Sequence, residues 1–178
     1  MVDISFNFTP EKVVNCIINS RLYFYCIGFF CKIVLFVYGL LFLTDNDEDD
    51  LMLLHEALLS FKQPFEIVEI FSGEELMEKL SKMTERFPDF IFLDIAMPGI
   101  DGFKCLELIK NRIKAPSLIK IIIYSGDSSE LSIQKGFSLG ADFYAVKPNR
   151  YEDLKNLVEL VIENDWKSSD TTDKVFHV

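Results

Sequence analysis

Residues 90–102 read FIFLDIAMPGIDG, a short apolar run that ends on Asp94 and is followed at once by loop-forming residues. Apolar runs of this length between turn signals are typical of strands that are buried on both faces of a parallel sheet. Three further apolar runs end on a polar residue in the same way: LLFLT before Asp45, IIIY before Ser125 and FYAV before Lys147. The chain therefore contains four apolar runs that each have a polar residue at the carboxyl end, and the run before Asp94 is one of them.

The segments between these runs have the periodicity of helices. In EDDLMLLHEALLSF, residues 48–61, leucines recur every three or four positions, and Ser72 and Glu75 have the spacing of a capping box at the start of a second helix. Strand and helix patterns alternate five times from residue 40 onward. This alternation predicts an α/β fold, with a parallel sheet covered by helices on both faces.

The composition changes near residue 40. We divide the chain into a hydrophobic N-terminal extension at 1–39, a domain at 40–165 and a polar C-terminal tail at 166–178. Residues 22–43 are long and apolar enough to suggest a membrane helix, but Lys32 near the centre of this window disfavours insertion. The extension is a leader that is not part of the native protein, a membrane anchor or an extra helix. These three readings stay open.

The charge and the cysteine content of the chain indicate which binding partners and which cellular compartment to expect. The 178 residues carry a formal net charge of -10 with no cluster of Lys and Arg, so we expect no binding to nucleic acid. The four cysteines lack CxxC spacing and nearby histidines, which is typical of reduced thiols. We therefore expect a cytoplasmic protein, or one tethered to a membrane through residues 13–38 if the extension is an anchor.

The polar residues that end the apolar runs suggest a chemical site. In an open parallel sheet, residues just past the carboxyl ends of the strands converge on one crevice, so Asp45, Asp94, Ser125 and Lys147 should line one pocket. A carboxylate nucleophile, a cation site, a hydroxyl and an ammonium together suit the acceptance of a phosphoryl group. Mg²⁺ suits an open acidic pocket of this kind. Asp45 directly follows a buried strand, where an unpaired carboxylate is costly without a cation.

Each of these assignments has a purely structural alternative. Most of the acids in the run from Asp47 to Asp50 are expected to stabilise the start of a helix rather than to act in the site. Lys147 could form an ordinary buried ion pair. Tyr144, which lies within the run FYAV before Lys147, could be a static, half-buried aromatic side chain with no part in the site.

Residues 40–165 resemble a bacterial response-regulator receiver domain of the stand-alone type. The resemblance rests on four segments that follow one another along the chain: the acidic loop LFLTDNDEDD, the phosphoacceptor segment FLDIAMPGIDG, the hydroxyl segment IIIYSG and the aromatic and lysine segment GADFYAVKP. It implies a flavodoxin-like (βα)5 fold, with a doubly wound, five-stranded parallel sheet in the order 2-1-3-4-5.

The resemblance also implies a role for individual residues. It implies that Asp94 is the phosphorylated residue, that Lys147 contacts the phosphoryl group and that Ser125 and Tyr144 form a switch pair. It further implies a cis peptide bond between Lys147 and Pro148. The implied Mg²⁺ site consists of four positions: Asp45, Asn46, Asp94 and the backbone carbonyl of Ala96.

Two positions depart from the family pattern. Asn46 stands where the family has the second acid of its acidic pair, so one negative charge is missing near the metal. Ala96, two residues after Asp94, keeps the backbone ligand but places no long side chain over the phosphoryl group.

Three classes of function follow. The first is a phosphoacceptor domain of a two-component phosphorelay, which is not an enzyme. It takes its phosphoryl group from a histidine kinase or phosphotransfer protein and signals to a downstream protein through the face of its fourth helix and fifth strand. The second is a pseudo-receiver that binds partners without phosphorylation because Asn46 weakens the metal site. The third, an aspartate-based phosphatase, is disfavoured because Ala96 stands where such enzymes need a second acid.

Overall fold

One parallel sheet forms the centre of the part of the chain that the structure describes. The computed structural model describes residues 39–60, 65–113, 116–163 and 175–176. Within these ranges the sheet has six strands in the order β2-β1-β3-β4-β5-β6. The strands are β1 (Gly39–Thr44), β2 (Phe65–Ile70), β3 (Phe90–Leu93), β4 (Lys120–Ser125), β5 (Phe143–Val146) and β6 (Val175–Phe176).

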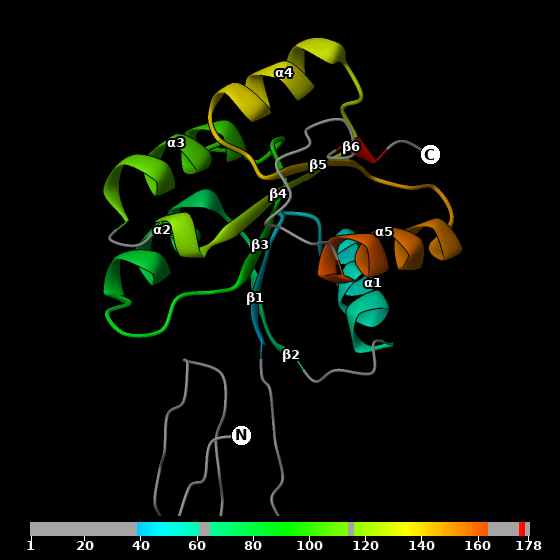
Figure 1. Ribbon diagram of the computed structural model, residues 1–178, viewed down its shortest axis with the longest axis horizontal. Helices are drawn as coiled ribbons and strands as arrows, with labels where there is room; N and C mark the ends of the chain where they lie inside the picture. Colours follow the sequence, from blue (N-terminus) through cyan, green and yellow to red (C-terminus); the bar gives the residue numbers. More distant parts are fainter. Residues whose placement is uncertain (1–38, 61–64, 114–115, 164–174, 177–178) are drawn as a thin grey trace, which may run out of the picture. The chain divides into compact units, whose positions relative to one another are not determined.

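Helices cover both faces of this sheet. Figure 1 shows α2 and α3 on one side and α1 and α5 on the other. The helices are α1 (Glu48–Leu59), α2 (Gly73–Lys82), α3 (Gly102–Arg112), α4 (Glu130–Ser138) and α5 (Tyr151–Glu163), with a short 3-10 helix, η1, at Pro116–Leu118. The predicted α/β fold and the strand order 2-1-3-4-5 are therefore confirmed.

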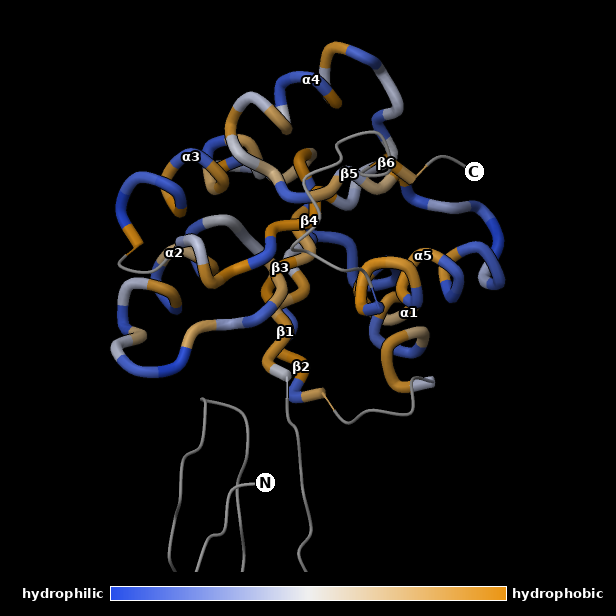
Figure 2. The backbone as a smooth tube through the Cα atoms, viewed as in Figure 1, coloured by the Kyte–Doolittle hydropathy of each residue, from blue (hydrophilic) through white to orange (hydrophobic). Residues whose placement is uncertain are grey.

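Alternation along each strand divides the core into two clusters. In β1, Leu40 and Phe42 belong to the cluster beneath α2, α3 and α4, whereas Leu41 and Leu43 pack beneath α1 and α5. Successive side chains of a strand point to opposite faces, so a strand that is covered on both faces must be apolar throughout. Figure 2 shows this as hydrophobic strands within helices that carry hydrophilic outer surfaces.

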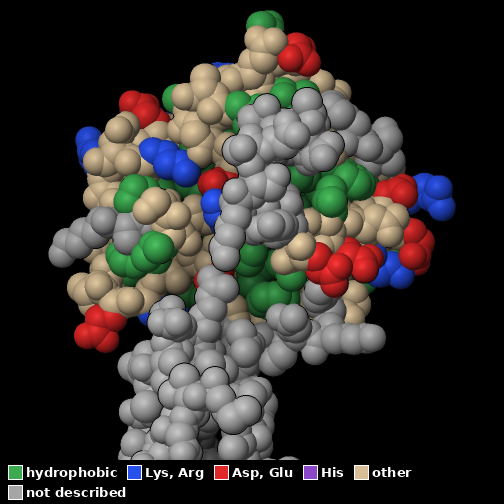
Figure 3. Space-filling view, viewed as in Figure 1, with side chains coloured by type: hydrophobic (Ala, Val, Ile, Leu, Met, Phe, Trp, Pro, Cys, Tyr) green, Lys and Arg blue, Asp and Glu red, His purple; other side chains and the backbone are tan. Residues whose placement is uncertain are grey.

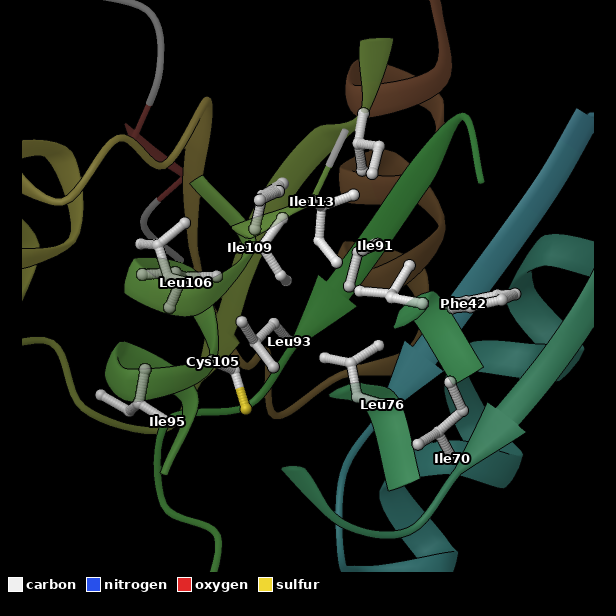
Figure 4. Close-up of a cluster of buried hydrophobic side chains, with 14 of the residues drawn as sticks. Phe42, Ile70, Leu76, Ile91, Leu93, Ile95, Cys105, Leu106, Ile109 and Ile113 are labelled. Carbon is white, nitrogen blue, oxygen red and sulfur yellow. The ribbon is translucent and has the colours of Figure 1, made fainter. Parts of the chain in front are cut away.

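The cluster beneath α2 and α3 draws side chains from distant parts of the sequence. Figure 4 shows Leu93 of β3 near Leu76 of α2 and Cys105 of α3, in a cluster that also includes Phe42 of β1 and Leu106 of α3. Cys105 is buried in this cluster, and burial raises the pKa of its thiol to about 12, so it remains an uncharged apolar side chain.

Local signals in the sequence place the ends of the helices. Ser72 is the N-cap of α2, where its hydroxyl accepts a hydrogen bond from the Glu75 backbone N–H at 3.2 Å. Gly140 closes the turn after α4 with a φ of 96°, a conformation that L side chains rarely adopt.

On the face shown in Figure 3, acidic and basic side chains of the described residues are scattered among one another over the helices.

The sixth strand was not expected. Val175 and Phe176 pair in parallel with Tyr144 and Ala145 of β5 and are half-buried. Val175 packs against one core cluster and Phe176 against the other. These two apolar side chains follow a polar tail, and their burial at the edge of the sheet explains why they extend it.

Several predictions fall on residues that lie outside the described ranges. They concern the three readings of the N-terminal extension and the cysteines at positions 16, 26 and 31. Among the described residues, the helices are too short or too polar to cross a bilayer.

Candidate functional site

The carboxyl ends of β1, β3, β4 and β5 open into one pocket of about 640 Å³. Asp45 and Asp94 directly follow β1 and β3, Ser125 ends β4 and Lys147 directly follows β5. All four line the pocket, as the position of each at the end of its strand predicts. The structure therefore brings together residues that are up to 102 positions apart in the sequence.

Hydrogen bonds of the sheet fix the backbone of this pocket. The N–H of Asp45 donates to the carbonyl of Ile70 in β2 at 3.1 Å, and the N–H of Asp94 donates to the carbonyl of Thr44 in β1 at 2.9 Å. The N–H of Lys147 donates to the carbonyl of Ser125 at 2.8 Å. In each case a strand of the sheet accepts a bond from the first residue after its neighbouring strand, so the sheet fixes the backbone at three points of the pocket.

The Lys147 ammonium lies among three carboxylates. Its Nζ is 2.6 Å from Oδ2 of Asp45, 2.7 Å from Oδ2 of Asp50 and 3.4 Å from Oδ1 of Asp94. Burial opposes the charged form of the amine, but the hydrogen bonds to Asp45 and Asp50 and the charge of Asp94 outweigh it and raise the pKa of Lys147. Lys147 is therefore a fixed positive charge at neutral pH.

Asp45 is almost fully buried beneath this ammonium. Its Oδ1 accepts the backbone N–H of Asp47 at 2.9 Å while its Oδ2 accepts Lys147. Burial raises the pKa of Asp45, and the hydrogen bonds from Lys147 and the Asp47 backbone oppose that rise. A second cation beside Asp45 would favour its ionised form further.

Asp94 is buried but faces the pocket. Its Oδ2 accepts the backbone N–H of Ala96 at 2.7 Å, so its Oδ1 is the oxygen that faces the Lys147 ammonium. The chain behind it is tightly packed, because a Cβ added to Gly102 would lie 2.1 Å from the carbonyl oxygen of Asp94. Glycine at this position therefore lets helix α3 begin directly against the backbone of Asp94.

Ser125 and Tyr144 lie at the β4 side of the pocket. The buried hydroxyl of Ser125 accepts the backbone N–H of Asp127 at 3.3 Å. Tyr144 is fully buried, and its hydroxyl donates to the carbonyl of Asp127 at 2.7 Å. Both side chains therefore contact the loop between β4 and α4, with Tyr144 in an inward position.

The two positions that depart from the family pattern both line the pocket. Asn46 and Ala96 are exposed at its rim. Asp47, in contrast, is the N-cap of α1 and accepts the backbone N–H groups of Asp49 and Asp50. The expectation that Asp47 stabilises the start of the helix therefore agrees with the structure.

Asp50 is the site residue that the sequence reasoning missed. The sequence predicts that the run from Asp47 to Asp50 mainly stabilises the start of a helix, but Asp50 reaches the Lys147 ammonium directly. One signal was available, since Asp50 lies four residues before the buried Leu54 and therefore on the inward side of α1. Five further lining residues were also not singled out: Ile95, Phe103, Gly126, Asp127 and Ser132.

The expected cis bond between Lys147 and Pro148 is wrong. The structure contains no cis peptide bond at this position. The trans form is the one that an X–Pro bond ordinarily prefers, by about 0.5–1 kcal/mol.

The oxygen atoms of the pocket fit a hard divalent cation. The three carboxylates around Lys147 and its single ammonium have a formal sum of -2 when all are ionised. Among the described residues, no group of three or more His, Cys, Asp and Glu side chains is placed to hold a metal ion by itself. Mg²⁺ keeps several waters and is usually held by only one or two carboxylates, and Asp45 and Asp94 both line this pocket.

Comparison with known proteins gives a consistent result. The sequence model of the family described as "Response regulator receiver domain" matches residues 41–159. Two relatives from Arabidopsis thaliana, the two-component response regulators ARR2 and ARR12, are 32% and 30% identical over 130 and 129 residues. These matches cover 71% and 72% of this chain but only 18% and 21% of the relatives, so the chain spans about a fifth of their length.

Solved structures show the same fold. The phosphorylated cyanobacterial phytochrome response regulator RcpA is 29% identical, with a TM-score of 0.64, and the match covers 75% of this chain and 97% of RcpA. The Mn²⁺-bound form of the response regulator Rcp1 is 23% identical, with a TM-score of 0.63 and the same coverage, and this likeness bears on the fold alone.

Proposed function

Because this chain belongs to the response regulator receiver domain family of two-component systems, we propose that it accepts a phosphoryl group on Asp94 and signals through the resulting change in its surface. One observation carries the proposal. Asp94, Asp45 and Lys147, which follow three different strands, converge in a single pocket that opens to solvent.

The proposed reaction is a transfer from a phosphohistidine of a kinase or phosphotransfer protein. A carboxylate oxygen of Asp94 attacks the phosphorus, a P–O bond forms, the P–N bond breaks and the leaving imidazole takes up a proton. The protein mainly positions these groups and stabilises their charge. The fixed charge of Lys147, 3.4 Å from Asp94, is placed to pair with an oxygen of the incoming group, and the Ser125 hydroxyl lies in the same pocket.

A divalent cation completes this charge balance. Mg²⁺ would be held by Asp45, Asp94, the side-chain oxygen of Asn46 and the backbone carbonyl of Ala96, and would neutralise charge on the phosphoryl oxygens. Burial raises the pKa of Asp45, and its hydrogen bonds to Lys147 and the Asp47 backbone reverse this rise only in part. A cation beside Asp45 would therefore stabilise its ionised form further.

The proposed output route runs through the loop between β4 and α4. A phosphoryl group adds negative charge and acceptor oxygens beside Ser125, whose hydroxyl now accepts the backbone N–H of Asp127. A Ser125 that turned toward the phosphoryl group would release this bond and shift Asp127, on which the Tyr144 hydroxyl also depends. The face of α4 and β5 would then differ between the two states and could be read by a downstream protein.

Intact mass measurement tests this function. The protein is incubated with a small-molecule acyl phosphate and Mg²⁺, with and without a chelator, beside the Asp94→Asn variant. We expect one phosphate adduct in the wild-type protein that disappears in the chelator and in Asp94→Asn. A wild-type protein that gains no adduct at any Mg²⁺ concentration would contradict the proposal.

A second candidate function rests on Asn46. Because an amide replaces the second acid at the rim of the pocket, a pseudo-receiver that binds its partner without phosphorylation is the alternative. It predicts no adduct in the same experiment. It also predicts partner binding that is unchanged in Asp94→Asn.

A further inference from the structure

Asp50 differs from the other acids in the first turn of α1. Glu48 and Asp49 are exposed, and Asp47 caps the helix, whereas Asp50 is half-buried and its Oδ2 lies 2.7 Å from the Lys147 ammonium. This contact is shorter than the 3.4 Å between the ammonium and Asp94, the proposed phosphoacceptor.

We propose that Asp50 is a positioning residue of this site, which anchors the Lys147 ammonium between helix α1 and the Asp45 loop and so keeps it off the Asp94 carboxylate. The inference rests on the proposed phosphoryl transfer. An ammonium has three donors, and here two of them make short bonds to Asp45 and Asp50. Only the longer contact is left for Asp94.

The anchor matters because Lys147 and a divalent cation require the same carboxylate. Without Asp50, the released donor of Lys147 would turn to Asp94, the remaining carboxylate beside it. The ammonium would then compete with the cation for the Asp94 oxygen and occupy the atom that must attack the phosphoryl group. Asp50 thus keeps this oxygen available in a pocket where Asn46 contributes no charge.

Direct Mg²⁺ binding to the full chain, measured by calorimetry without a phosphodonor, tests the anchor. In Asp50→Asn we expect Mg²⁺ affinity to fall about 3- to 30-fold. The matched control is Asp49→Asn, which removes the same charge from an exposed neighbour in the same helical turn. It should change the affinity less than about twofold, because exposed charges are screened. Equal losses in the two variants would overturn the proposal.

Measurements in a Lys147→Gln background distinguish a positioning role of Asp50 from an effect of its charge alone. If Asp50 acts by holding Lys147, then Asp50→Asn should cost no more affinity in a Lys147→Gln background than Asp49→Asn does there, since no ammonium is left to move. If the loss caused by Asp50→Asn is the same with and without Lys147, Asp50 acts through its charge alone and the proposal is wrong.

A metal-free measurement distinguishes failure of this proposal from failure of the proposed function. The proton–nitrogen NMR signal of the Lys147 ammonium should be visible in the wild-type protein and in Asp49→Asn. It should broaden in Asp50→Asn, because the freed ammonium exchanges faster with water. A signal that does not depend on Asp50 overturns the anchor. If the signal depends on Asp50, the contact between Asp50 and Lys147 is supported even if calorimetry detects no Mg²⁺ binding. The absence of Mg²⁺ binding would then contradict the proposed phosphoryl transfer and not the contact.

Discussion

At the scale of single residues, Tyr144 links the core to the loop of the pocket through one hydroxyl. Its ring fills the core beneath α4, and its O–H donates to the carbonyl of Asp127. Burial, together with the nearby charges of Asp127 and Asp94, raises the pKa of Tyr144 to about 12. The ordinary value for tyrosine is about 10.

This pKa predicts a loss of stability in alkali. Between about pH 10 and pH 12 the folded state keeps the Tyr144 proton while the unfolded state loses it, so the free energy of unfolding falls as pH rises, by at most about 1.4 kcal/mol per pH unit. Tyr144→Phe should be less stable at neutral pH, by about 1 kcal/mol for the lost hydrogen bond, but should show a flatter alkaline decline. Urea unfolding at several pH values measures both effects.

The control for this prediction is Tyr151→Phe, which removes the hydroxyl of a tyrosine that is 40% exposed. Its alkaline decline should match that of the wild-type protein. If Tyr144→Phe declines as steeply as Tyr151→Phe, then the buried hydroxyl does not hold its proton in this range.

A second prediction at this scale concerns the acid that is missing at position 46. Asn46→Asp adds a carboxylate to the rim of the pocket, where it should tighten Mg²⁺ binding about tenfold. Calorimetric titration measures this affinity, and Glu48→Gln, an exposed change in the same segment, serves as a control. Unchanged affinity in Asn46→Asp would show that this side chain does not face the metal.

Single residues of the site were predictable where a strand fixes them and less so elsewhere. Asp45 and Asp94 follow buried strands directly, so the sheet decides where their backbones lie. Asp50 is placed by the rotation of α1 instead, and rotation has to be read from the spacing to Leu54 rather than from a single acid. The peptide bond before Pro148 is trans, the form that X–Pro bonds ordinarily prefer, whereas the cis form was implied only by the resemblance.

At the scale of elements, the start of α3 is held against the end of β3 by a glycine. A Cβ at Gly102 would lie 2.1 Å from the carbonyl oxygen and 2.9 Å from the carbonyl carbon of Asp94. Because both are backbone atoms of a strand end, they cannot move aside easily.

Gly102→Ala should therefore lower the free energy of unfolding by about 1–3 kcal/mol, despite the better helix propensity of alanine. The matched control is Gly126→Ala, where an added Cβ meets no atom within 4 Å and the change should stay within about 0.5 kcal/mol. Urea unfolding compares the two. Equal stability of the variants would mean that α3 does not pack this closely on Asp94.

Helices and strands were predictable where their apolar residues form a recognisable pattern in the sequence. Four of the five strands that precede helices are marked by apolar runs, and the order of the strands follows from the resemblance to receiver domains. Strand β6 has only two residues and follows a polar segment, so it has no period to detect. It forms because the edge of β5 and the two core clusters accept Val175 and Phe176.

At the scale of the whole molecule, binding in the pocket should stabilise the fold. The three carboxylates around Lys147 come from the β1 loop, α1 and the β3 loop, so a cation that joins two of these segments binds the folded state alone. A tenfold excess of Mg²⁺ over its dissociation constant should therefore add about 1.4 kcal/mol to the free energy of unfolding. Thermal unfolding with and without Mg²⁺ measures this, and Asp45→Asn should abolish the gain. A shift of the same size in Asp45→Asn would place the cation elsewhere.

The central claim is that Asp94 is the residue that receives the phosphoryl group. Treatment of the phosphorylated chain with borohydride reduces an acyl phosphate to an alcohol, so peptide mass analysis then identifies the modified position. We predict homoserine at position 94 and aspartate at positions 45, 47, 50 and 127, the other acids that line the pocket. Homoserine at any of these four positions with an unmodified Asp94 would contradict the account.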